Sequence, residues 1–159
     1  MIVAEIGLNH MGSAKILQRY LRLTSSVDAV SIQVLSDSFY QNEKYASFKL
    51  SDKVIMDFIN KAYEAGFKVG LVVDNYDLVE KFHSDRVSFY KILSKDIDNF
   101  DLFKTISGTS VNDIYISTGL SLSNALDEII PRLINSDNRV KLIHTQLSNK
   151  IEDVNLKAI

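Results

Sequence analysis

Six short runs of β-branched and apolar residues recur along the chain, and segments with helical spacing of apolar residues separate them. The runs are Ile2–Gly7, Ala29–Val34, Lys68–Val73, Phe89–Ser94, Asp113–Thr118 and Val140–Gln146. Their first residues lie 21 to 39 positions apart. This rhythm is typical of βα units, in which parallel strands are covered by helices. It predicts an α/β fold with about six such units.

The segments between the runs carry the apolar stripes expected of helices. One stripe runs from Val54 to Ala62, with Ser51 as its predicted N-cap and Gly66 as its end. The last stripe covers residues 122–133 and contains Pro131, which should kink the helix or end it early. The interval "SDSFYQNEKYASFKLSDK" is polar and rich in tyrosine, and it reads as a long βα loop of the kind that often covers a binding site.

Six βα units could form a doubly wound open sheet or most of a (β/α)8 barrel. In barrels, functional side chains gather at the carboxyl ends of many strands. Polar residues recur there in this chain, at Asn9, His10, Gln33, Asp74, Asn75, Lys91, Ser94, Ser117 and His144. We therefore expect a TIM-barrel-like fold that is incomplete, in a single domain over residues 1–159.

Composition narrows the classes of function. The 159 residues have a net charge of −2, with 46% apolar and 24% charged residues, so no broad basic surface for nucleic acid is expected. The absence of cysteine excludes disulfides and Cys-ligated zinc. No apolar run approaches the roughly 18 residues of a membrane span, and no basic segment precedes the first run, which argues against a signal peptide. These features fit a cytoplasmic protein without a membrane partner.

Glu5 interrupts the first apolar run, where an unpaired buried carboxylate would cost several kcal/mol. It could pair with a lysine or arginine, face outward, or act in a site. Asn9 and His10 follow it, close to Gly12, and this arrangement is typical of close backbone packing around a small polar ligand.

Two further strand ends carry groups that suit an anion. Lys91 lies among apolar residues and could be a surface lysine at a sheet edge, a phosphate or carboxylate ligand, or a Schiff-base amine. Ser117, in "YISTGLS", offers a hydroxyl and nearby backbone N–H groups for an oxyanion, although helix capping is the commoner use of such residues. His144 is most simply a hydrogen-bonded core residue, and the three histidines form no close pair that would indicate a metal site.

Several stretches in order resemble the sialic acid synthase (N-acetylneuraminate synthase) family. The opening "AEIGLNHMG" is similar to A-E-I-G-x-N-H-x-G, "DAVSIQV" to D-A-V-K-F-Q, and "YKILSKDIDN" to Y-K-I-x-S-G-D-x-x-N. The stretches "ISTGLS", "LIHTQ" and "EDVNLKAI" resemble the family's S-T-G-M turn, its L-L-H-C strand and its E-D-x-N-L-x-x-I tail.

The resemblance implies a TIM barrel that condenses phosphoenolpyruvate with N-acetylmannosamine or its 6-phosphate, with a divalent metal, Mn or Mg. It implies that Glu5 is the acid/base carboxylate and that Gln33 contacts the sugar. Lys91, Ser94 and Ser117 would hold phosphoenolpyruvate, and Asn9 and His10 of the opening motif belong to the substrate-binding set.

The chain also departs from the family pattern. Ser31 stands in place of the lysine of K-F-Q, Lys95 replaces a glycine, and "TQLSNK" replaces C-T-x-x-Y-P. The S-D-H and E-x-H-F-T motifs that carry the family's metal histidines are absent, as is the antifreeze-like domain. The metal ligands are thus not encoded here, and a second copy or a partner chain is expected to complete the barrel. The alternative is a non-catalytic relative that binds a sugar or a partner.

Overall fold

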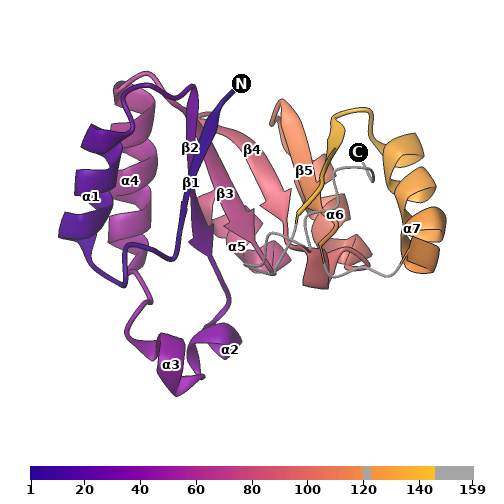
Figure 1. Cartoon of the computed structure of the whole chain (residues 1–159), viewed down its shortest axis with the longest axis horizontal. Helices are drawn as coiled ribbons and strands as arrows, with labels where there is room; N and C mark the ends of the chain where they lie inside the picture. Colours follow the sequence, from indigo (N-terminus) through magenta and orange to yellow (C-terminus); the bar gives the residue numbers. More distant parts are fainter. Residues whose placement is uncertain (120–122, 146–159) are drawn as a thin grey trace, which may run out of the picture.

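The computed structural model of the chain describes residues 1–119 and 123–145, and these form one curved, six-stranded parallel sheet (Figure 1). The strands are β1 (Val3–Gly7), β2 (Ala29–Val34), β3 (Lys68–Val73), β4 (Val87–Ile92), β5 (Asp113–Ser117) and β6 (Val140–Ile143). They pair in sequence order, from β1 to β6. A doubly wound sheet would change direction within this order, so the topology is that of an incomplete barrel.

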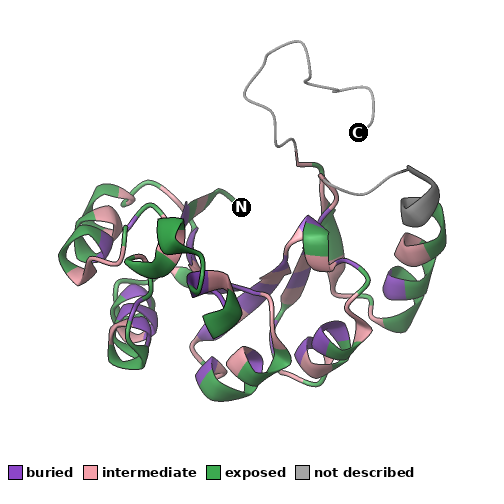
Figure 2. Cartoon of the chain, turned by 90° about the horizontal axis from the view of Figure 1, so that it is seen from below, coloured by how far each residue is buried: buried purple, intermediate pink, exposed green. Residues whose placement is uncertain are grey.

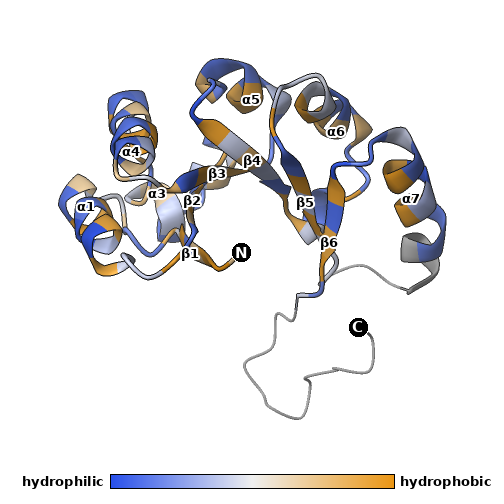
Figure 3. Ribbon diagram, turned by 90° about the horizontal axis from the view of Figure 1, so that it is seen from above, coloured by the Kyte–Doolittle hydropathy of each residue, from blue (hydrophilic) through white to orange (hydrophobic). Residues whose placement is uncertain are grey.

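Five longer helices lie along the outer side of the curved sheet (Figure 3). They are α1 (Ala14–Leu23), α4 (Asp52–Glu64), α5 (Tyr76–Phe82), α6 (Phe100–Ser107) and α7 (Ser123–Ser136). Two short helices, α2 (Asp37–Tyr40) and α3 (Glu43–Ala46), follow β2, and the 3-10 turn η1 (Ser94–Asp96) follows β4. The inner, concave side of the sheet carries no helix in this part of the chain.

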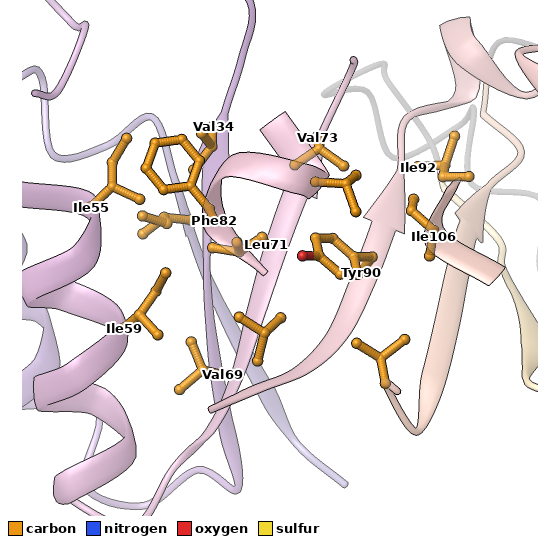
Figure 4. Close-up of a cluster of buried hydrophobic side chains, with 14 of the residues drawn as sticks. Val34, Ile55, Ile59, Val69, Leu71, Val73, Phe82, Tyr90, Ile92 and Ile106 are labelled. Atoms are coloured by element: carbon orange, nitrogen blue, oxygen red, sulfur yellow. The ribbon is translucent and has the colours of Figure 1, made fainter. Parts of the chain in front are cut away.

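The core lies between the sheet and these helices. Tyr90 and Leu71 of the sheet and Ile59 of α4 are completely buried there, in a cluster that Figure 4 shows in close-up. Figure 2 shows the same arrangement as buried residues gathered on the strands and on the helix sides against them. Each such side chain contributes about 1.5–3 kcal/mol to folding by leaving water. The apolar stripes predicted from the sequence are therefore the helix faces that cover the sheet.

The bounds of these elements agree with most of the predictions. β2 and β3 match at both ends, Ser51 caps α4 by accepting a hydrogen bond from the Val54 N–H, and Gly66 has a φ of +87° at the end of that helix. β4 lies two residues earlier than predicted, because Ser94 already belongs to the 3-10 turn. Gln146, Leu122 and the 152–159 tail lie outside the described residues.

Two local predictions are wrong. The interval after β2 is not a plain loop, because α2 and α3 form within it around the packed rings of Phe39 and Tyr45, 4.8 Å apart. The early end expected at Pro131 is also wrong, because the helix continues to Ser136, while the alternative of a kink at Pro131 stays a prediction. Leu133, beyond the proline, is buried in the core, and this packing outweighs the one backbone hydrogen bond that the proline cannot donate.

No helix in the described part of the chain combines the length and the apolar character that crossing a membrane requires.

Candidate functional site

Alternate residues of each strand face the concave side of the sheet. In register there, Glu5 of β1 lies beside Ser31 of β2, Ser31 beside Gly70 of β3, and Gly70 beside Phe89 of β4. Gly70 is required at its position because a Cβ would lie 2.1 Å from the Phe89 ring. The ring of Phe89 therefore occupies the place above Gly70, while the small side chain of Ser31 lines a cavity beside Glu5.

Glu5 and Lys91 meet across this space. The Lys91 Nζ lies 2.5 Å from the Glu5 Oε2, and the Gln33 Nε2 donates a longer hydrogen bond of 3.4 Å to the Glu5 Oε1. β1 and β4 are three strand spacings apart, about 14 Å along a flat sheet, so the curvature of the sheet is what allows contact. The Lys91 side chain is only 12% exposed and that of Glu5 35%. Lys91 is thus an inward-facing lysine and not a surface one.

The turn after β1 holds Asn9 and His10 in structural hydrogen bonds. The Asn9 side-chain amide donates to the Ile6 carbonyl, and the His10 Nδ1 accepts from the Gly12 N–H at 3.0 Å. Gly12 has a φ of +74°, and a Cβ there would lie 2.0 Å from the Ser47 carbonyl oxygen. The turn therefore shows the close backbone packing that the sequence indicated.

His10 is completely buried, and burial lowers its pKa. Its Nε2 has no hydrogen-bond partner in the structure. With Nδ1 acting as an acceptor, the neutral ring carries its proton on Nε2. No described contact joins His10 to Glu5 or Lys91, so the two halves of the opening motif have separate surroundings.

Ser117 and Ser94 lie at or just after the carboxyl ends of neighbouring strands. Lys91 pairs in register with Tyr115, so Ser117 follows two residues further along the same face of β5. Ser117 is 3% exposed, and its Oγ has no hydrogen-bond partner among residues 1–119 and 123–145. Ser94 is buried and opens the 3-10 turn η1. An unpartnered buried hydroxyl near a lysine suits an oxyanion ligand.

The sequence did not reveal a second polar cluster at the same edge of the sheet. The Asp74 carboxylate accepts hydrogen bonds from the Ser36 N–H at 2.8 Å and from its hydroxyl at 3.0 Å. The Lys95 Nζ lies 2.7 Å from Asp96 and 3.9 Å from Asp74. Burial raises the pKa of Asp96, while Lys95 opposes that shift. The polar residues after β3 and β4 were the available signal, but only the fold shows that they meet.

A second ion pair, between Asp113 of β5 and Lys141 of β6, lies on the concave face. Lys141 of this pair lines a cavity of about 380 Å³, together with Glu5, Lys91 and the edge-to-face rings of Phe89 and Tyr115, whose centroids are 5.3 Å apart. The alternation in "DIYIS" and "VKLI" was the signal for these inward-facing residues. His144, expected in the core, is exposed.

The described residues do not fit a divalent metal. Within residues 1–119 and 123–145, no three or more His, Cys, Asp or Glu side chains group so that they could hold a metal ion. The ammonium groups of Lys91 and Lys95 already lie against the carboxylates of Glu5 and Asp96.

Solved structures with a similar fold come from carbohydrate-related proteins. The N-acetylneuraminic acid (sialic acid) synthetase from Leptospira borgpetersenii serovar Hardjo-bovis, in complex with citrate, is 19% identical with a TM-score of 0.86, and the match covers 99% of this chain and 59% of that one. A putative spore coat polysaccharide biosynthesis protein E from Chromobacterium violaceum is 14% identical with a TM-score of 0.79, over 92% and 49% of the two chains.

The fold extends to another kind of synthase. A truncated form of 3-deoxy-D-arabino-heptulosonate 7-phosphate synthase from Thermotoga maritima is 14% identical with a TM-score of 0.67, over 91% of this chain and 52% of that one. The chain therefore spans between about half and three fifths of the length of these structures. At such identities the likeness establishes the fold alone.

Among curated proteins, none matches the chain significantly. The sequence does match a family pattern, that of the NeuB family, over residues 20–159. This match covers most of the strands and helices described above, and the six-stranded incomplete barrel agrees with it. The chain belongs to the NeuB family.

Proposed function

We propose that the chain binds phosphoenolpyruvate on the concave face of its sheet and takes part in condensing it with N-acetylmannosamine, or its 6-phosphate, to a sialic or related nonulosonic acid. The observation that carries the proposal is the contact of Glu5 with Lys91. It brings one carboxylate and one ammonium together across the open side of the sheet, at the carboxyl-terminal half of the strands. Family membership and the resemblance of the motifs around both residues support it.

Each proposed role follows from the chemistry of a side chain. Lys91 supplies positive charge to the carboxylate or phosphate of phosphoenolpyruvate. The buried Ser117 hydroxyl, which has no partner in the structure, donates a hydrogen bond to the same ligand, and Ser94 lies at the neighbouring strand end. Gln33, which already contacts Glu5, meets the sugar. Asn9 and His10 shape the turn that borders this region.

The proposed reaction forms one carbon–carbon bond and replaces the carbon–oxygen bond to phosphate by a carbon–oxygen bond to water. The methylene carbon of phosphoenolpyruvate attacks the aldehyde carbon of the open-chain sugar. Water adds to the phosphate-bearing carbon, and phosphate leaves with its bridging oxygen, so that the oxygen of the water becomes the ketone oxygen. The two protons of the water go to the aldehyde oxygen and to the phosphate. Glu5 carries a proton between water and the aldehyde oxygen as general acid and base.

In this proposal, any divalent metal is held by residues outside the described part of the chain. Because the described residues form no group that fits one, no step of the proposed reaction passes through a metal held by them. A partner chain of different sequence would supply that part of the site, and either it or a second copy of this chain would cover the open side of the sheet. We also propose a cytoplasmic location, because phosphoenolpyruvate is the proposed substrate.

A phosphate-release assay tests the proposal. The purified chain is incubated with phosphoenolpyruvate, Mn²⁺ and either N-acetylmannosamine or its 6-phosphate, and free phosphate and the mass of the sugar product are followed. We expect sugar-dependent phosphate release that Lys91→Met abolishes. Lys53→Met, at an exposed lysine of α4, is the matched control and should leave the rate unchanged. Size-exclusion chromatography of the same sample reports whether the active species is a dimer.

The absence of a fitting metal group in the described residues favours one second candidate, a non-catalytic relative that binds an amino sugar or a partner. Calorimetry separates the two. Binding of N-acetylmannosamine without any phosphate release at high protein concentration would support the second candidate. Sugar-dependent phosphate release by the chain would exclude it.

A further inference from the structure

We propose that the Glu5 carboxylate is the resident anion of Lys91, and that an anionic ligand binds only by displacing Glu5 from the lysine. This inference rests on the proposed function in that it concerns the same site, and it goes further by assigning Glu5 a role in controlling anion affinity. It names the chemistry of the competing group, which is a carboxylate or a phosphate.

The first argument is the position of Lys91. Its side chain is 12% exposed, and its Nζ lies 2.5 Å from the Glu5 Oε2. Phe89 precedes it on the same face of β4, and Tyr115 is its register partner on β5, so apolar rings flank the stem. Because the Lys91 ammonium is shielded on most sides, few positions beside it are accessible. The Glu5 carboxylate occupies the position that an oxyanion of a ligand would take.

The second argument is that the Glu5 side chain can move away from Lys91 at low cost. It is 35% exposed, and β1 is the end strand of the described sheet. The strand register shifts between Glu5 and Gly7, and Gly7 has a φ of +57°, so the backbone beside Glu5 is not locked into a regular ladder. The other described hydrogen bond of the Glu5 carboxylate, from Gln33, is long at 3.4 Å.

The third argument is the space beside the pair. The cavity of about 380 Å³ is lined by Glu5, Lys91, Phe89 and Tyr115. Ser31, the register partner of Glu5, also lines it and has a small side chain. A compact anion can approach Lys91 through this cavity while Glu5 turns toward water. Once displaced, the carboxylate lies beside the ligand without its lysine, and this is the state in which it can accept a proton.

The competition predicts an unusual effect of removing a charged group from a binding site. Replacing Glu5 by glutamine keeps the shape of the side chain and its ability to contact Gln33, but it removes the anion that Lys91 holds. Anion affinity should therefore rise, although a residue of the site has been altered. If Glu5 only positioned the ligand or the sugar, Glu5→Gln would lower the anion affinity or leave it unchanged.

The test is calorimetric titration of wild type, Glu5→Gln and Lys91→Met with phosphoenolpyruvate and, separately, with inorganic phosphate. We expect Glu5→Gln to bind both anions about tenfold more tightly, which corresponds to about 1.4 kcal/mol, and Lys91→Met to bind neither measurably. Asp52→Asn is the matched control, since it converts a carboxylate to an amide in the exposed Asp52–Lys81 pair. Its affinities should equal those of wild type.

The outcomes separate this inference from the proposed function. Equal or weaker binding of inorganic phosphate by Glu5→Gln would overturn the inference, even if wild type binds phosphoenolpyruvate. Tighter phosphate binding by Glu5→Gln, with no phosphoenolpyruvate binding by any variant, would uphold the competition and overturn the proposed function. Glu5→Ala, which also removes the charge, provides a second reading if Glu5→Gln does not fold. Circular dichroism melting curves verify the fold of each variant.

Discussion

The two faces of the sheet are made by the same strands, yet they follow different rules. On the outer face, Leu71, Tyr90 and Ile116 are completely buried under helices, and apolar side chains fill the space. On the concave face, the Glu5–Lys91 ion pair, Lys141 and the buried Ser31 line a cavity. Successive residues of each strand point to opposite faces, so the residues that stabilise the core and the polar residues of the site lie on opposite sides of the same sheet.

The largest effect is expected from truncating a side chain of the outer face. Leu71→Ala removes a completely buried side chain, and we expect the free energy of unfolding to fall by about 3 kcal/mol, as for other large-to-small changes in a core. Urea denaturation measures the change. Anion affinity of the folded fraction should stay at the wild-type value. A loss of anion binding without a loss of stability would contradict the division.

The second prediction concerns side-chain packing on the concave face. Gly70→Ala places a methyl group 2.1 Å from the original position of the Phe89 ring, so the ring must move. We expect unfolding to become easier by about 2 kcal/mol, within the range of overpacked cores. The double variant Gly70→Ala with Phe89→Leu should recover part of this loss in the same denaturation experiment. No recovery would mean that the ring is not the obstacle.

The third prediction concerns the charge on the concave face. Lys91→Met keeps an apolar stem but leaves Glu5 without its ammonium, and we expect at least a tenfold loss of affinity for phosphoenolpyruvate, about 1.4 kcal/mol. The melting temperature should change much less than for Leu71→Ala, since Glu5 is partly exposed and water can solvate it. Isothermal calorimetry and thermal melting measure the two quantities. Unchanged affinity would remove Lys91 from the site.

The smallest expected effect is a dependence of stability on pH through His10, in the turn that leaves β1. Burial lowers its pKa below the value near 6.5 of the unfolded chain. As the pH falls through that value, the unfolded chain gains a proton that the folded protein does not bind, so stability falls. One such proton changes the free energy of unfolding by at most about 1.4 kcal/mol per pH unit.

His10→Gln removes this titration and is the variant that isolates it. The difference in unfolding free energy between pH 7.5 and pH 5.5 should be smaller for His10→Gln than for wild type, as measured by urea denaturation at both values. An identical pH dependence in the two proteins would show that other groups cause it.

Much of the architecture was predictable because it depends on local periodicity. The apolar runs located every strand, and β2 and β3 were predicted to the residue. The cap at Ser51 and the stop at Gly66 followed from the hydrogen-bonding and dihedral preferences of single residues. Of the two effects expected of Pro131, a kink or an early end, the early end does not occur, because the burial of Leu133 beyond it is a tertiary effect.

The candidate site was predictable in its members but not in its pairings. Glu5, Gln33, Lys91 and Ser117 stood out as polar groups in or after apolar runs, and the fold places all four on one face. The sequence left Lys91 open between a surface residue, an anion ligand and a Schiff-base amine. Pairing with a lysine or arginine was one possibility for Glu5, but the sequence did not indicate that the partner would be Lys91, 86 residues away. It also did not indicate that Asp74 and Asp96 would meet around Lys95.

The sequence by itself determined the order of strands and helices and which residues of one element share a face, because both depend on periods of two and of about 3.6 residues. The tertiary structure alone decided which charges meet. Contact between the first and fourth strands depends on how strongly the sheet curves. It also depends on the register, which places Glu5 in the row of Ser31 and Gly70 and Lys91 one step further along, beside Val72. Such contacts arise from the packing of the whole sheet and are carried by no single stretch of the chain.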